Sequence, residues 1–132
     1  MLSHILCAMA IRTTFYHPDR VVIGIASGDM RLEDFIEFAR EIQKANVVHY
    51  RKLLDVVDAR PAFSEPELRA LVQVIRETPT GPRGAIAFVA DPHRGEFAKL
   101  FSNLEVQGRP ARVFRSLHEA RKWLTENPPV EE

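Results

Sequence analysis

The chain has 132 residues, of which 45% are hydrophobic and 27% charged, and this balance is typical of one globular domain with a single core. Its 18 basic and 18 acidic residues cancel, so it lacks the basic excess of most proteins that bind nucleic acid or anionic membranes. The single cysteine, Cys7, cannot form an internal disulfide, which favours a reducing, cytoplasmic location.

Residues 1–10 are interpreted as a prefix to the domain. Their apolar stretch is too short to cross a membrane and follows no basic leader, so we expect no membrane span. Met1 and Met9 are both candidate start positions, and the sequence leaves that choice open. The domain is predicted over residues 11–124, followed by a flexible tail over residues 125–132.

The first predicted elements are a β-hairpin and a helix. Residues 11–16 are β-prone, residues 17–20 read His-Pro-Asp-Arg as a turn does, and residues 21–26 are rich in β-branched side chains. So short a connection predicts antiparallel pairing. Ser27-Gly28-Asp29 is predicted to end the second strand, and apolar residues at helical spacing then predict a helix over 32–44.

The next unit is a strand followed by a second helix. Residues 53–57 predict the strand, with Asp55 inside it, and we expect this carboxylate to face outward and accept a loop amide. Ser64 and Glu67 have the spacing of a capping box, which predicts the start of a helix. Pro66 fits the first turn of that helix because its missing N–H costs nothing there.

Two further strand–helix units complete the domain. Residues 84–89 are almost wholly apolar, which predicts a central parallel strand covered on both faces. Residues 91–104 predict the helix that follows. Residues 111–115 predict a last strand, after which Ser116 begins a helix closing on Trp123, a side chain expected to be at least half buried.

The predicted order of elements is ββαβαβαβα. Strands joined through helices run parallel with right-handed crossovers, whereas the hairpin supplies one antiparallel pair. The sequence therefore predicts a single-domain α/β fold, a five-stranded, mostly parallel mixed sheet with four helices.

The loops after the parallel strands are the first place to seek a ligand, because ligands of open α/β sheets gather at the carboxyl ends of strands. Asp58 and Arg60 follow the third predicted strand, and His93 and Arg94 follow the fourth. They could form the mouth of a ligand site, with Asp58 and His93 as the plausible acid–base pair. In the alternative that we prefer, Asp91 caps its helix and the basic residues decorate an exposed turn.

The other reactive side chains show no catalytic or metal-binding pattern. The histidines lack metal-ligand spacing along the sequence: His4, His17, His49, His93 and His118. The glycines at 81 and 84 precede a strand, so they do not form a phosphate-binding loop between strand and helix. We therefore predict no cofactor, no metal and no enzymatic activity.

The first two helices carry more apolar surface than a sheet contact needs. An apolar stripe about 100° wide suffices to cover a sheet, and Phe38 and Val74 widen it to about half the circumference. This extra flank could pack against a neighbouring helix, line a hydrophobic cavity or form a contact between two copies of the chain.

With this order of elements, the chain resembles the SpoIIAA-like family, whose fold is that of STAS domains (sulfate transporter and anti-sigma factor antagonist) and is often discussed with lipid-binding CRAL-TRIO domains. The resemblance covers about residues 11–124. It depends on three stretches: Lys52-Leu-Leu-Asp-Val56 followed by the Ser64 helix, Ala85–Val89 followed by Phe97-Ala-Lys-Leu-Phe101, and the ending Val113–Leu124.

Ser64 has two interpretations. Anti-sigma factor antagonists of this fold carry a phosphorylatable serine where the strand after the first helix meets the second helix, typically within Asp-Ser-Ser-Gly. The matching stretch here is Ala62-Phe-Ser-Glu-Pro66, which keeps the serine and lacks the preceding Asp and following Gly. The resemblance therefore implies the fold and not the phosphoregulation, and we expect Ser64 to be a helix cap that accepts the Glu67 N–H.

These features predict a non-enzymatic protein-interaction or regulatory module, without nucleic acid, whose partner is another protein or a second copy of the chain through Phe38 or Val74. The alternative is a carrier or sensor of a small apolar or acidic ligand, as in CRAL-TRIO domains. Such a ligand would lie beneath the first two helices, in an internal cavity of several hundred Å³.

Overall fold

The computed structural model describes residues 10–77, 83–91, 93 and 111–130. The helices and strands in these ranges are, in chain order, β1 (Ile11–Tyr16), β2 (Val21–Met30), α2 (Leu32–Lys44), β3 (Arg51–Pro61), α3 (Glu65–Glu77), β4 (Ile86–Val89), β5 (Ala111–Phe114) and α5 (Leu117–Glu126). No helix among the described residues is long and apolar enough to cross a membrane.

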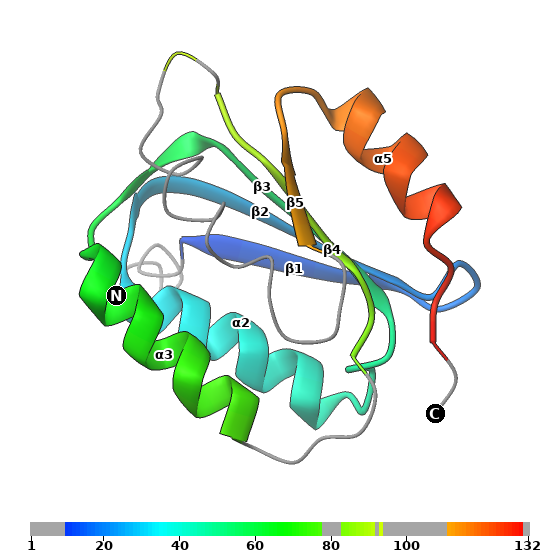
Figure 1. The fold of residues 1–132 in the computed structure, drawn as a ribbon, viewed down its shortest axis with the longest axis horizontal. Coiled ribbons are helices and arrows are strands. Elements are labelled where there is room, and N and C mark those ends of the chain that lie inside the picture. Colours follow the sequence, from blue (N-terminus) through cyan, green and yellow to red (C-terminus); the bar gives the residue numbers. More distant parts are fainter. Residues whose placement is uncertain (1–9, 78–82, 92, 94–110, 131–132) are drawn as a thin grey trace, which may run out of the picture.

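The five strands form one sheet in the order β1-β2-β3-β4-β5. Only β1 and β2 pair antiparallel, and the other neighbours are parallel, so the predicted mixed sheet is confirmed. Helices α2 and α3 lie on one side of the sheet and α5 on the other (Figure 1). The described residues contain three helices, and the fourth one predicted, over 91–104, falls almost wholly outside them.

The larger core lies between the sheet and α2. A Cβ atom on Gly24 in β2 would stand 2.7 Å from the Phe38 ring and 2.9 Å from the Leu54 side chain, so the ring fills the space that this glycine leaves open. Phe38 is accordingly only 4% exposed. The prediction that Phe38 lies at an interface is wrong, because its ring is buried in the space above Gly24.

A smaller core lies beneath α5, on the opposite face. Leu53 and Ala87 of the sheet meet Ala120 and Leu124 of the helix there. Trp123 is partly buried, with its ring centroid 5.5 Å from that of Phe114, which confirms the expected burial. The four residues of β4 are all buried and pair on both sides, as predicted for an internal strand.

Two strands run further than the sequence indicates. Ser27-Gly28-Asp29 does not end β2, which continues to Met30, and β3 continues to Pro61. Their parallel pairing persists through a shift in register, since Ile25 pairs with Asp55 whereas Ser27 pairs with Asp58. Cross-strand pairing thus overrides the local strand-breaking signal at Gly28.

Asp55 lies at this irregularity. Two residues of β3 stand opposite one of β2 there, an arrangement that disrupts the regular backbone ladder. The Asp55 carboxylate accepts a hydrogen bond from the Val57 N–H, with Oδ1 at 3.0 Å. The carboxylate therefore accepts a backbone N–H as expected, although this N–H belongs to the strand itself and not to a loop.

Candidate functional site

The predicted ligand mouth is not assembled as expected. Asp58 and Arg60 lie within the extended β3 and not in a loop. The Arg60 guanidinium pairs with Asp29 of β2, at 3.0 Å from Nη2 to Oδ1, and both side chains are exposed. The His93 N–H donates to Asp91 Oδ1 at 2.9 Å, and the helix that Asp91 is expected to cap lies outside the described residues. No hydrogen bond joins Asp58 to His93 in the described parts of the chain, and Arg94 lies outside them.

Ser64 caps α3 as predicted. Its hydroxyl oxygen accepts the Glu67 N–H at 3.3 Å, and Glu67 Oε1 accepts the Ser64 backbone N–H at 2.9 Å. The Ser64 hydroxyl also donates to Glu67 Oε1 at 3.0 Å. The hydrogen bonds from the Ser64 backbone and then from its hydroxyl hold the pKa of Glu67 below its usual value of 4.5. The serine therefore serves the local structure of the helix start.

The sheet has an uncovered region beside α5, which we call the open face. It consists of the side chains that alternate along β1 and β2 away from the larger core: Arg12, Thr14, Tyr16, Val21, Ile23 and Ile25. Tyr16 is 46% exposed and Ile25 43% exposed. Helix α5 packs mainly on β3, β4 and β5, so the described residues cover β1 and β2 only in part on this side: Ile23 packs against the smaller core, whereas Tyr16 and Ile25 are exposed.

A groove of about 460 Å³ runs between α5 and the open face. Its apolar wall includes Val21, Ile23 and Leu124, and its polar rim includes Arg51 and Arg121. Leu117, 45% exposed, precedes Arg121 and Leu124 by four and seven residues, which puts it on the same side of α5. Of the large hydrophobic side chains exposed in the described residues, Tyr16 and Ile25 lie on the open face, and Tyr16 also lines the groove.

Arg51 fixes the end of this groove. Its guanidinium donates through Nη1 to the Leu124 carbonyl at 2.9 Å and through Nη2 to the Asp19 carbonyl at 2.5 Å. One side chain thus ties α5 to the turn between β1 and β2. The groove is a preformed feature of the fold, because its two walls are joined by these hydrogen bonds.

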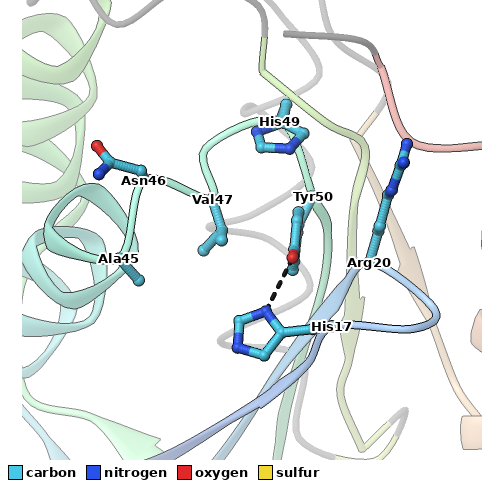
Figure 2. A pocket seen from close by; sticks show the side chains of 7 residues that line it. All are labelled: His17, Arg20, Ala45, Asn46, Val47, His49 and Tyr50. Carbon is cyan, nitrogen blue, oxygen red and sulfur yellow. Dashed lines mark hydrogen bonds between the residues drawn. The ribbon is translucent and has the colours of Figure 1, made fainter.

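A second hollow, the hairpin pocket, lies at the amino ends of β2 and β3, the end of the sheet opposite the predicted mouth. It measures about 550 Å³ and is lined by His17, Arg20, Ala45, Asn46, Val47, His49 and Tyr50 (Figure 2). His17 Nδ1 and the Tyr50 hydroxyl are hydrogen-bonded at 2.8 Å. The His49 ring packs edge-on against Tyr50, with centroids 5.0 Å apart.

Sequence reasoning missed this pocket. It considered His17 and His49 only as metal ligands, whereas these two residues lie 32 positions apart and line one pocket because β2 pairs in parallel with β3. A usable signal is the His-Pro-Asp-Arg turn, where an arginine ends the connection at a position that favours glycine or asparagine. Among the described residues, no group of three or more His, Cys, Asp or Glu side chains could hold a metal ion.

The fold has solved counterparts. An uncharacterized protein of the DUF3478 family with a SpoIIAA-like fold, from Shewanella loihica, is 16% identical and superposes with a TM-score of 0.57, covering 87% of this chain and 92% of that chain. An anti-sigma factor antagonist from Mycobacterium paratuberculosis is 15% identical with a TM-score of 0.53, covering 87% of this chain and 94% of that chain. No family model and no curated protein matches the sequence.

These similarities define the class of the protein. It is an α/β protein of the SpoIIAA-like fold, and the resemblance predicted from the sequence is confirmed at the level of the fold. Identities this low carry the arrangement of strands and helices and do not transfer an activity.

Proposed function

We propose that this chain is a non-enzymatic regulatory module that acts by binding another protein, and that the open face is its binding surface. The observation that carries the proposal is the pair of exposed side chains Tyr16 and Ile25 on the open face, beside a groove that Tyr16 lines. Large contiguous apolar patches are uncommon on soluble proteins outside interaction sites. The similar structure named an anti-sigma factor antagonist supports a regulatory role of this kind.

The surface has the composition of a protein interface. Ile23 and Ile25 form an apolar centre in adjacent outward positions of β2, and Arg12 lies directly across from Ile25 on β1. Asp55 flanks Ile25 on the other side, from β3. An apolar centre with a polar rim is the usual anatomy of a protein–protein contact.

The occupant that fits this surface is an amphipathic helix of a partner protein, lying beside α5. Helices normally cover both faces of a mostly parallel sheet, and among the described helices α5 is the one that covers this face, over β3, β4 and β5. The vacant strip over β1 and β2 continues that helical layer. Arg12 and Arg121 are exposed on its two sides without an ion-pair partner among the described residues, so acidic flanks on the incoming helix complement them.

The alternatives receive less support from the geometry. A carrier needs space beneath the first two helices, and under α2 that space is filled by Phe38 packed against Gly24. Self-association through Phe38 fails for the same reason, because this ring is buried. The acid–base pair that the sequence suggested for an enzyme is not formed, because no hydrogen bond joins Asp58 and His93 in the described structure.

Photo-crosslinking in the cells that make the protein tests the proposal. A photoreactive amino acid at position 25 on the open face is compared with one at position 74 on α3, where Val74 is also exposed, at 60%. We expect position 25 to capture one discrete partner through a helical segment with acidic flanks, and position 74 not to capture it. Crosslinks to a second copy of the chain alone, or the same products at both positions, would overturn the proposal.

A further inference from the structure

We infer that the hairpin pocket is a binding site for a small oxyanion, that is, the phosphate or carboxylate group of a ligand. Its volume of about 550 Å³ falls within the range of small-molecule sites. The seven described residues that line it offer a guanidinium, two imidazoles, a phenol and an amide, and none of them is an Asp or Glu. A pocket rich in donors and without carboxylates on its lining favours a negatively charged group.

The hydrogen bond between His17 and Tyr50 fixes which ring nitrogen faces a ligand. When Nδ1 of the neutral ring accepts the phenol proton, the imidazole proton resides on Nε2, which becomes a donor. If the ring is protonated, Nε2 still donates. Figure 2 shows this second nitrogen of His17 pointing away from Tyr50, so the hydrogen bond to Tyr50 does not occupy it.

The wall formed by residues 45–50 is held in place by backbone contacts. The Gly84 N–H donates to the Val48 carbonyl at 3.1 Å, and Tyr50 N–H donates to the Val47 carbonyl at 2.9 Å. A Cβ atom on Gly84 would stand 2.2 Å from the Tyr50 carbonyl oxygen, so only glycine permits this approach. A wall fixed in this way loses little conformational entropy when it binds a ligand.

The end of α2 opposes an anion less than a helix C-terminus with free carbonyl groups would. Free carbonyl groups at a helix C-terminus repel negative charge. In this protein the carbonyls of Glu41, Ile42 and Gln43 accept the N–H groups of residues 45, 47 and 46, at 3.1, 3.2 and 3.0 Å respectively. Their hydrogen-bonding capacity is used within the turn that precedes the pocket.

Backbone strain gathers at the same place. Among the described residues, the non-glycine residues with positive φ are Arg20, at +54°, and Asn46, at +59°, and both line the hairpin pocket. Asparagine tolerates this conformation, but a long arginine side chain gains nothing from it locally. Strained conformations cluster at ligand sites, where the side chain they present compensates for the strain.

Titration of the isotopically labelled full chain by NMR tests the inference. Inorganic phosphate and acetate are added separately at constant ionic strength, with sodium chloride as the matched blank. We expect saturable shifts of the His17, Arg20 and Asn46 amides with one or both oxyanions. Saturation by phosphate alone assigns a phosphate group, saturation by acetate alone assigns a carboxylate, and saturation by both assigns an oxyanion site common to the two.

Two variants at position 20 separate binding from folding. Glycine adopts positive φ readily, so Arg20→Gly keeps the turn, and we expect it to weaken anion binding at least about tenfold through loss of a charged hydrogen bond. Arg20→Lys should retain binding within about threefold, because the positive charge remains. Arg115→Gln, at the other end of the sheet, is the control and should bind as the unaltered chain does. The inference is wrong if neither anion saturates by about 100 mM, roughly a hundred times a millimolar Kd, or if Arg20→Gly and Arg115→Gln bind alike.

Discussion

On the α5 side of the sheet, strands β3, β4 and β5 are packed under the helix, whereas β1 and β2 are partly exposed. Leu53 of β3 lies under α5 and is 1% exposed, whereas Ile25 of β2, one strand away on the same face, is 43% exposed. Both are large aliphatic residues in neighbouring strands. The difference teaches that burial on this face depends on the position of α5, and that an apolar pattern in a strand does not by itself reveal which side chains are available for binding.

The largest expected effect is a loss of stability from a substitution in the core beneath α5. Leu124→Ala removes a side chain that is 4% exposed between α5 and the sheet, and it should lower the free energy of unfolding by about 2–5 kcal/mol. Ile25→Ala on the open face should change it by less than about 1 kcal/mol. Urea denaturation of both variants measures the contrast. Equal losses would mean that the open face contributes to the core as fully as the covered half does.

The next effect compares the helix caps on the two sides of the sheet. Ser64 accepts the Glu67 N–H before α3, and Ser116 accepts the Glu119 N–H before α5 at 3.2 Å. Ser64→Ala and Ser116→Ala should each cost about 1 kcal/mol of stability. Thermal melts of the two variants provide the measurement. A negligible loss for Ser64→Ala alone, together with a phosphorylated Ser64 in cells, would favour the regulatory serine over the cap.

The smallest expected effect is a dependence on pH at the α3 start. The pKa of Glu67 is lower in the folded chain than its usual 4.5, because its carboxylate accepts the Ser64 hydrogen bonds. The resulting stabilisation is complete above the unfolded value and is lost as the pH falls through the folded one. Glu67→Gln keeps a hydrogen-bond acceptor without the charge. The free energy of unfolding that this variant lacks relative to the unaltered chain should therefore shrink as the pH falls below 4.5. Urea denaturation at several pH values measures this difference in the free energy of unfolding. A difference that stays constant would refute the stabilisation of the Glu67 carboxylate by the Ser64 hydrogen bonds.

Much of the fold could be predicted because its signals are local. The turn at residues 17–20, the bounds of α2 and the serine caps of α3 and α5 each depend on residues within one or two turns of chain. The extensions of β2 and β3 depend on their pairing with each other, so the local break at Gly28 misled the prediction. Likewise, the place of Phe38 depends on Gly24, which lies 14 residues earlier in a different element.

The candidate sites were harder to predict than the fold. The open face requires knowing that α5 covers three strands and leaves two, which no periodicity in the sequence encodes. The hairpin pocket joins the end of a turn to a loop about 30 residues later. The sequence suggested that Arg60 could bind a ligand, whereas in the structure it forms an ion pair with Asp29 of the neighbouring strand. The domain limits, the cytoplasmic location and the choice of start residue stay predictions.

The most direct test of the central claim is the affinity of the crosslinked partner for two matched variants. Ile25→Lys places a charge on the open face, and Val74→Lys places the same charge at an exposed apolar position of α3. If the open face is the binding surface, Ile25→Lys should weaken the purified complex at least about tenfold and Val74→Lys less than about threefold, with both variants folded. Equal affinities of the two variants, or a loss confined to Val74→Lys, would contradict the account.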